Sequence, residues 1–164
     1  MAISERAGPR WPAAVALHDQ LLDYFYDDLR PTKAFPVALK LQRLLDRLDS
    51  AAETLPGNEY RAVIAELDGD LPAAIRHREW VVERMERLLA SGQLSAAQLG
   101  VDDLSDQLDL LASCLLETGR MRDDKRVIAR SERLCREADI PFDGADVKAD
   151  ILRAGGRRKA TSVR

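Results

Sequence analysis

Hydrophobic residues along the chain recur at intervals of three and four, which is the spacing of one face of an α-helix. The pattern is clearest after Pro36, where the apolar positions are Val37, Ala38, Leu41, Leu44, Leu45, Leu48 and Ala52. No stretch alternates apolar and polar residues one by one, as a half-exposed β-strand does. The pattern therefore predicts an all-α protein.

Turn and capping residues divide the apolar pattern into about seven helices. Proline is tolerated in the first turn of a helix and disfavours helix in the residue before it, while glycine follows many last turns. By these signals the predicted helices span residues 11–29, 36–55, 58–67, 71–90, 103–118, 123–138 and 144–152. Short connectors make consecutive helices antiparallel neighbours. We expect antiparallel helical hairpins, arranged as a superhelix or as a compact bundle.

Prolines and aspartates mark the predicted starts and ends of several helices. Pro36 is expected to open the second helix, and Pro56-Gly57 to end it. Asp70 is the expected N-cap of the fourth helix, and Asp102 or Asp103 that of the fifth. The expected apolar face of the first helix is Val15, His18, Leu21, Leu22, Phe25 and Leu29, and that of the fifth is Leu104, Leu108, Leu111 and Leu115.

The helices at 58–67 and 71–90 share a pattern of small residues. Alanine or valine stands where the paired helices would touch, at Ala62, Ala65, Ala74 and Val81. Gly69-Asp70 forms the turn between them. Over residues 58–90 the chain resembles a tetratricopeptide repeat, in which small residues let two helix backbones approach closely.

A second, weaker match to this family spans residues 103–138. The residues of its first helix that fit are Leu108, Leu111, Ala112 and Leu115, and Gly119-Arg120 forms the turn. Asp124, however, stands where the second helix should offer alanine. The turn glycines Gly69 and Gly119 are 50 residues apart, whereas the family repeats every ~34. The resemblance implies an irregular right-handed superhelix whose concave surface binds a peptide or a partner protein without catalysis.

Composition and charge limit the classes of partner. The 164 residues are 46% hydrophobic, enough for one domain with a continuous core. The net charge of −3 includes five basic residues and no acid in 153–164, so residues 1–152 carry −8. We expect one domain over 1–152 and a flexible basic tail over 153–164. An acidic body repels phosphate, so a nucleic-acid partner is disfavoured except through the tail.

The sequence also predicts the setting of the protein. The start of the chain has no hydrophobic signal region, and no apolar run approaches the ~18 residues that cross a bilayer. We therefore expect a cytoplasmic protein without a membrane partner. Cys114 and Cys135 are predicted to be two buried thiols rather than a disulfide.

No motif in the sequence points to catalysis, a metal or a cofactor. There is no P-loop, Gly-rich dinucleotide turn, HExxH or CxxC pair. The only histidines are His18 and His77. His18 lies on the apolar face of its helix and is interpreted as a packed core histidine, the alternative being a metal site shared with His77. The sequence therefore indicates no enzyme, metal site or cofactor.

Arg78 occupies an apolar-face position of the helix at 71–90, where a lone buried guanidinium would be costly. It should form a structural salt bridge, extend its charged end to solvent, or contact a ligand. Together with Arg76 and His77 it forms the predicted partner-binding set. Asp23 and Asp27, four residues apart on one helix, are either a solvated face or a contact for a cation or a basic peptide.

The leading hypothesis is an interaction module that binds a protein or peptide in a groove between hairpins. The alternative is a homo-oligomeric structural or regulatory protein, in which the apolar face of helix 36–55 or 71–90 forms a homodimer seam. A third hypothesis, a small helical enzyme or metal-binding protein, requires a buried polar pocket that joins His18 to Asp23 or Arg78.

Overall fold

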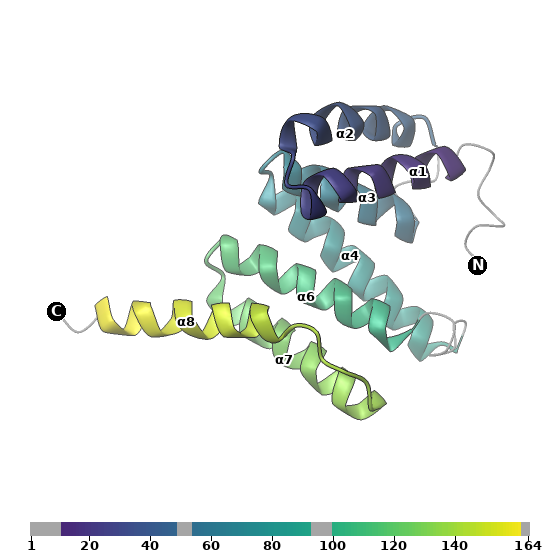
Figure 1. The fold of residues 1–164 in the computed structure, drawn as a ribbon. Coiled ribbons are helices and arrows are strands. Elements are labelled where there is room, and N and C mark those ends of the chain that lie inside the picture. The colour runs from purple at the N-terminus through teal and green to yellow at the C-terminus, as the bar shows by residue number, and fades with distance from the viewer. Residues whose placement is uncertain (1–10, 49–53, 93–99, 162–164) are drawn as a thin grey trace. The chain divides into compact units, whose positions relative to one another are not determined.

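All regular structure in the computed structural model is helical. The structure describes residues 11–48, 54–92 and 100–161. Within those ranges it contains seven α-helices, one π-helical turn and no strand (Figure 1). The predicted all-α fold is therefore confirmed.

The chain divides into two compact units, residues 1–77 (unit 1) and 78–164 (unit 2), and the boundary falls inside α4. The elements up to this helix are α1 (Trp11–Leu22), η2 (Asp23–Asp27), α2 (Pro31–Leu45), α3 (Leu55–Leu67) and α4 (Leu71–Ala90). Those after it are α6 (Val101–Glu117), α7 (Met121–Ala138) and α8 (Ala145–Thr161). The single domain expected over residues 1–152 stays a prediction.

The core of unit 1 is aliphatic and centres on α2, which contacts both α1 and α3. Its fully or nearly fully buried residues are Ala14, Leu21, Ala34, Val37, Ala38, Leu41, Leu45, Tyr60, Val63, Ile64 and Leu67. Most of the apolar face predicted for the second helix thus packs inside the unit, although Ala52 lies outside the described residues. That face of α2 is consequently not free to form a homodimer seam.

Two proline positions differ from the prediction. Pro31, not Pro36, opens α2, and Pro36 lies in the second turn of the helix. There it removes one backbone hydrogen bond, that to the Thr32 carbonyl, but both residues are exposed, so water can solvate that carbonyl. Pro56 begins α3 instead of ending the preceding helix. Thr54 caps α3 by accepting a hydrogen bond from the Gly57 N–H at 3.2 Å.

The turn between α3 and α4 forms as expected. Gly69 adopts a left-handed backbone with φ of 76°, which glycine alone tolerates freely. The Asp70 carboxylate accepts a hydrogen bond from the Ala73 N–H at 3.1 Å and so caps α4. Both the turn and the cap were predicted from sequence.

Unit 2 contains the α6–α7 hairpin with α8 packed against it. The four leucines predicted for the apolar face, Leu104, Leu108, Leu111 and Leu115, are all buried. The predicted N-cap is wrong: Gly100, with φ of 68°, occupies that position, and Asp102 and Asp103 lie in the first turn of α6. Cys114 and Cys135 are buried and form no disulfide, as expected.

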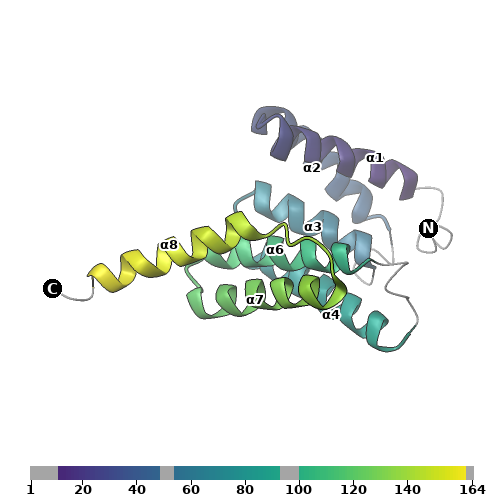
Figure 2. The ribbon, with the colours of Figure 1, turned by 60° about the horizontal axis from the view of Figure 1, so that its bottom comes forward.

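The basic C-terminal segment differs from the flexible tail predicted for residues 153–164. The α8 helix continues through residue 161, and its last turns extend past the α6–α7 hairpin (Figures 1 and 2). Alanine, arginine and lysine in this segment favour helix. The Gly155-Gly156 pair, which disfavours helix, is the reason that a flexible tail was predicted. Residues 162–164 lie outside the described ranges.

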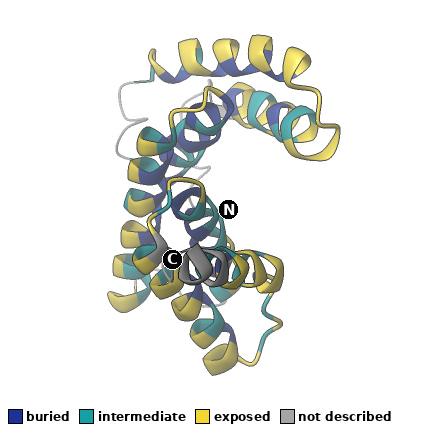
Figure 3. Cartoon of the chain, turned by 90° about the vertical axis from the view of Figure 1, so that its left-hand side faces the viewer, coloured by how far each residue is buried: buried dark blue, intermediate teal, exposed yellow. Residues whose placement is uncertain are grey.

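Figure 3 shows buried residues along one side and exposed residues along the other in most of the helices. The first helix departs from its predicted face at both ends. Ala14 is buried whereas Val15 is 43% exposed. The helix gives way at Asp23 to the π-helical turn, and a 2.7 Å hydrogen bond from the Arg30 N–H to the Tyr24 carbonyl closes its end. Leu29, predicted to be apolar-facing, is 75% exposed.

Leu29 adopts a left-handed backbone with φ of 49°, which is strained for a residue with a Cβ atom. We predict that Leu29→Gly raises the free energy of unfolding by about 0.5 to 1 kcal/mol, because relief of this strain outweighs the added chain entropy. Urea denaturation measures the change. Leu39→Gly is the matched control, since Leu39 is also exposed but lies inside α2, and it should lose about 1 kcal/mol. A destabilised Leu29→Gly protein would contradict the prediction.

Candidate functional site

The three residues predicted to bind a partner do not share one surface. Consecutive residues of an α-helix point about 100° apart. Arg76 is exposed, His77 is half-buried, and Arg78 is only 2% exposed. The three side chains therefore lie in three different environments.

The His77 side chain is held in a defined orientation by Asn58. Its Nδ1 atom lies 3.0 Å from the Asn58 Oδ1 atom. The Asn58 amide nitrogen donates to the Thr54 carbonyl at 3.0 Å, so the amide oxygen is the atom that faces the imidazole. His77 then donates through Nδ1, and the Nε2 lone pair is left for another group. Burial, followed by the charges of Arg61 and Arg76, lowers the pKa of His77, so the ring is neutral at pH 7.

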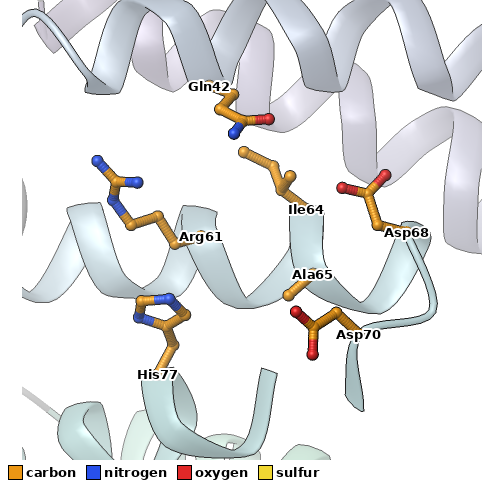
Figure 4. A pocket seen from close by; sticks show the side chains of 7 residues that line it. All are labelled: Gln42, Arg61, Ile64, Ala65, Asp68, Asp70 and His77. Carbon is orange, nitrogen blue, oxygen red and sulfur yellow. The ribbon is translucent and has the colours of Figure 1, made fainter. Parts of the chain in front are cut away.

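His77 lines a cavity of about 170 Å³ in unit 1, which we call the α3 pocket. The lining residues are Gln42, Arg61, Ile64, Ala65, Asp68, Asp70 and His77. Figure 4 shows Arg61 and His77 at one end of the pocket, Asp68 and Asp70 at the other, and Ile64 and Ala65 between them. The pocket thus has a basic end, an apolar floor and an acidic end.

Arg61 supplies the positive charge at the basic end of this pocket. Asp46, which does not line the pocket, compensates that charge. Its Nη2 atom lies 3.3 Å from the Asp46 Oδ1 atom. Its Nε atom is buried and has no hydrogen-bond partner within the described part of the chain. The guanidinium therefore keeps an unused donor although its charge is compensated.

The Arg78 side chain is buried inside unit 2 and does not lie on the surface. Its Nη1 atom donates to the Gln107 amide oxygen on α6 at 3.4 Å. Asp124 on α7, which stands where the tetratricopeptide pattern expects alanine, is also fully buried. Arg78 and Asp124 each have an interaction partner. Because Arg78 is almost inaccessible to solvent, a partner cannot reach its guanidinium in this structure.

Hydroxyl and thiol groups form a buried polar cluster between α6 and α7. The Ser105 Oγ atom lies 2.8 Å from the Ser131 Oγ atom and 3.1 Å from the Cys135 Sγ atom. Asp109 joins the cluster through a hydrogen bond with Ser131. All three residues of the cluster core are at most 4% exposed, so these hydrogen bonds satisfy polar groups inside the helix pair.

Three aspartates along α6 have raised pKa values. Burial is the largest cause for Asp103, Asp106 and Asp109, and repulsion from neighbouring aspartates adds to it. Asp143, in the segment before α8, contributes to the shift at Asp106 and Asp109. Their ionisation at neutral pH therefore opposes folding.

Unit 2 also contains a groove that the sequence did not predict as a site. It has a volume of about 420 Å³ and is lined by Glu86, Leu89, Ala90, Leu104, Arg130, Arg133, Leu134 and Glu137. These residues come from the end of α4, the start of α6 and the second half of α7. We call it the α4–α6–α7 groove. Leu89 and Leu134 remain partly exposed there.

Two ion pairs lie among the lining residues of this groove. Arg130 pairs with Glu86. Arg133 lies 4.0 Å from Glu137, one turn further along α7. The lining therefore combines apolar side chains with charged ones of both signs, a composition found at protein interfaces.

The other sequence-predicted groups lie apart from these sites. The His18 ring stacks on the Tyr60 ring with centroids 4.2 Å apart, which fits the core-histidine interpretation. Burial also raises the pKa of Tyr60 to about 12. Asp23 and Asp27 are exposed on η2. Among the described residues, no group of three or more His, Cys, Asp or Glu side chains could hold a metal ion. No described helix is long and apolar enough to span a bilayer.

Comparison with known protein-family models, with curated proteins and with solved structures found no match for this chain. The resemblance to tetratricopeptide repeats stays a prediction. The geometry of the two cavities is therefore the basis for any functional proposal.

The raised pKa of Asp109 predicts a pH-dependent stability. The carboxyl group of Asp109 has a higher pKa in the folded protein than the usual 3.8. Its protonated form therefore adds to the folding stability fully below pH 3.8, and this contribution is lost as the pH rises through the folded-state pKa. Asp109→Asn removes this loss and keeps a hydrogen-bonding side chain. The variant should unfold at higher urea than the parent at neutral pH, and the difference should vanish near about pH 3.

The control for this experiment is Asp27→Asn, which removes the same charge from an exposed position in unit 1. It corrects for the general effect of one fewer negative charge on the chain. A difference between Asp109→Asn and the parent that is equally large at acidic and neutral pH would contradict the assigned ionisation.

Proposed function

We propose that this chain is a non-catalytic protein-interaction module that binds a short amphipathic helix of a partner protein in the α4–α6–α7 groove. The observation that carries the proposal is the groove itself, whose lining combines three leucines and an alanine with two ion pairs. Amphipathic helices bind such grooves through apolar residues on one face, while their flanking charges meet the charged residues of the groove. The resemblance to tetratricopeptide repeats, whose function is to bind proteins, supports the same class.

The groove suits an apolar anchor with charged neighbours better than a purely charged ligand. Its apolar lining residues are Leu89, Ala90, Leu104 and Leu134. Its two acidic and two basic lining residues compensate one another, so the groove presents no net charge to attract a strongly charged ligand. An amphipathic helix can instead cover the apolar residues and place charges of both signs beside the charged ones.

The test is a matched pair of alanine-to-arginine variants. Ala90 is exposed and lines the groove, whereas Ala129 is exposed on α7 and does not line it. A random peptide library displayed on phage is selected on the full-length protein, and the enriched peptides are titrated by fluorescence anisotropy. We predict that Ala90→Arg weakens their binding about tenfold or more, because the arginine fills the groove, and that Ala129→Arg leaves binding unchanged.

Circular dichroism of both variants checks that the helices persist. Enrichment of no peptide, or enriched peptides that bind Ala90→Arg as tightly as the parent, would refute the proposed function.

A further inference from the structure

Basic, apolar and acidic side chains follow one another along the α3 pocket of unit 1 (Figure 4). Arg61 and the Ile64–Ala65 pair lie three and four residues apart on one face of α3, and Asp68, the C-cap of the helix, continues this spacing. Seven residues of α-helix span about 10 Å. The backbone positions of Arg61 and Asp68, at the basic and the acidic end, are thus about 10 Å apart along the helix axis.

The charge balance of the pocket favours a cation. Asp46 compensates Arg61, and the lowered pKa of His77 keeps its ring neutral at pH 7. Two further carboxylates remain, on Asp68 and Asp70. One oxygen of Asp70 caps α4 by accepting from the Ala73 N–H, and Asp68 is exposed beside it in the turn. A positive group at this end gains attraction from both aspartates.

The remaining lining residues suit an aliphatic chain that continues into a polar backbone. Ile64 and Ala65 form the apolar floor (Figure 4). At the far end lie the guanidinium of Arg61, whose side chain is 26% exposed, and the amide of Gln42. Both can donate to a peptide carbonyl. The pocket therefore offers carboxylates for an ammonium, apolar surface for methylenes and donors for a carbonyl.

We propose that the α3 pocket binds the side chain of a lysine residue of a partner protein. The ammonium lies between Asp68 and Asp70, the four methylenes cover Ile64 and Ala65, and the lysine backbone carbonyl accepts from Arg61 or Gln42. Lysine fits better than arginine because its compact ammonium requires no planar pair of acceptors. The site is distinct from the α4–α6–α7 groove and does not depend on the proposed function of that groove.

The experiment titrates the ¹⁵N-labelled full-length protein with N-acetyl-lysine methylamide and follows its amide signals by NMR. N-acetyl-norleucine methylamide is the matched probe, since it has a similar aliphatic stem but no ammonium. We expect saturable shifts at the amides of residues 61–70 with the lysine probe, and binding about fivefold weaker or more with norleucine.

Asp68→Asn tests the acidic end without altering its shape. It should weaken the lysine probe about fivefold, whereas Asp27→Asn, an exposed charge removal in the same unit, should leave binding unchanged. Both variants are expected to keep the parent spectrum outside the substituted site.

Three results would overturn the proposal. They are equal binding of the two probes, an Asp68→Asn protein that binds lysine as the parent does, and shifts confined to residues far from the pocket lining. A parallel titration with spermidine separates a free polyamine from a protein side chain. Tighter binding of spermidine than of the lysine probe would refute the assignment to lysine.

Discussion

Unit 1 depends on the burial of α3. Nine of the thirteen residues in this helix are buried, so nearly every side of it packs against something, and few substitutions in it can be neutral. Its apolar residues complete the core with α2, and Tyr60 supports the ring of His18 on α1. The same rigid helix presents Arg61 at its edge and ends at the turn that carries Asp68 and Asp70.

Unit 2 stabilises its helix pair in a different way, with polar groups placed inside it. Burying a hydroxyl or a guanidinium is unfavourable unless hydrogen bonds replace those to water. Ser105 and Ser131 meet this need across α6 and α7, and Arg78 meets part of it through Gln107. These contacts require one register of the helices. The α4–α6–α7 groove, with its two ion pairs, lies on the outside of that fixed arrangement.

The two cavities were not equally accessible from sequence. His77 was named as a contact residue, and it does line the α3 pocket, but Arg78 was named with it and is buried. Spacing on α3 could have linked Arg61 to Asp68, because helical neighbours seven residues apart share a face. The contribution of Gln42 could not be foreseen, since it comes from another helix. The groove was missed because leucines on an apolar face look identical whether a neighbour covers them fully or partly.

Local physics explains what the sequence by itself determined: helical periodicity, the glycine turn at Gly69 and the cap at Asp70 all act within a few residues. Prolines were ambiguous because a first turn and a helix end both accept them, and in the structure α2 begins at Pro31 and places Ala34 in the core. Tertiary structure alone decided the strained backbone of Leu29, the burial of Arg78 and the composition of both cavities. Each of these depends on how far apart distant helices pack, a quantity that no local pattern encodes.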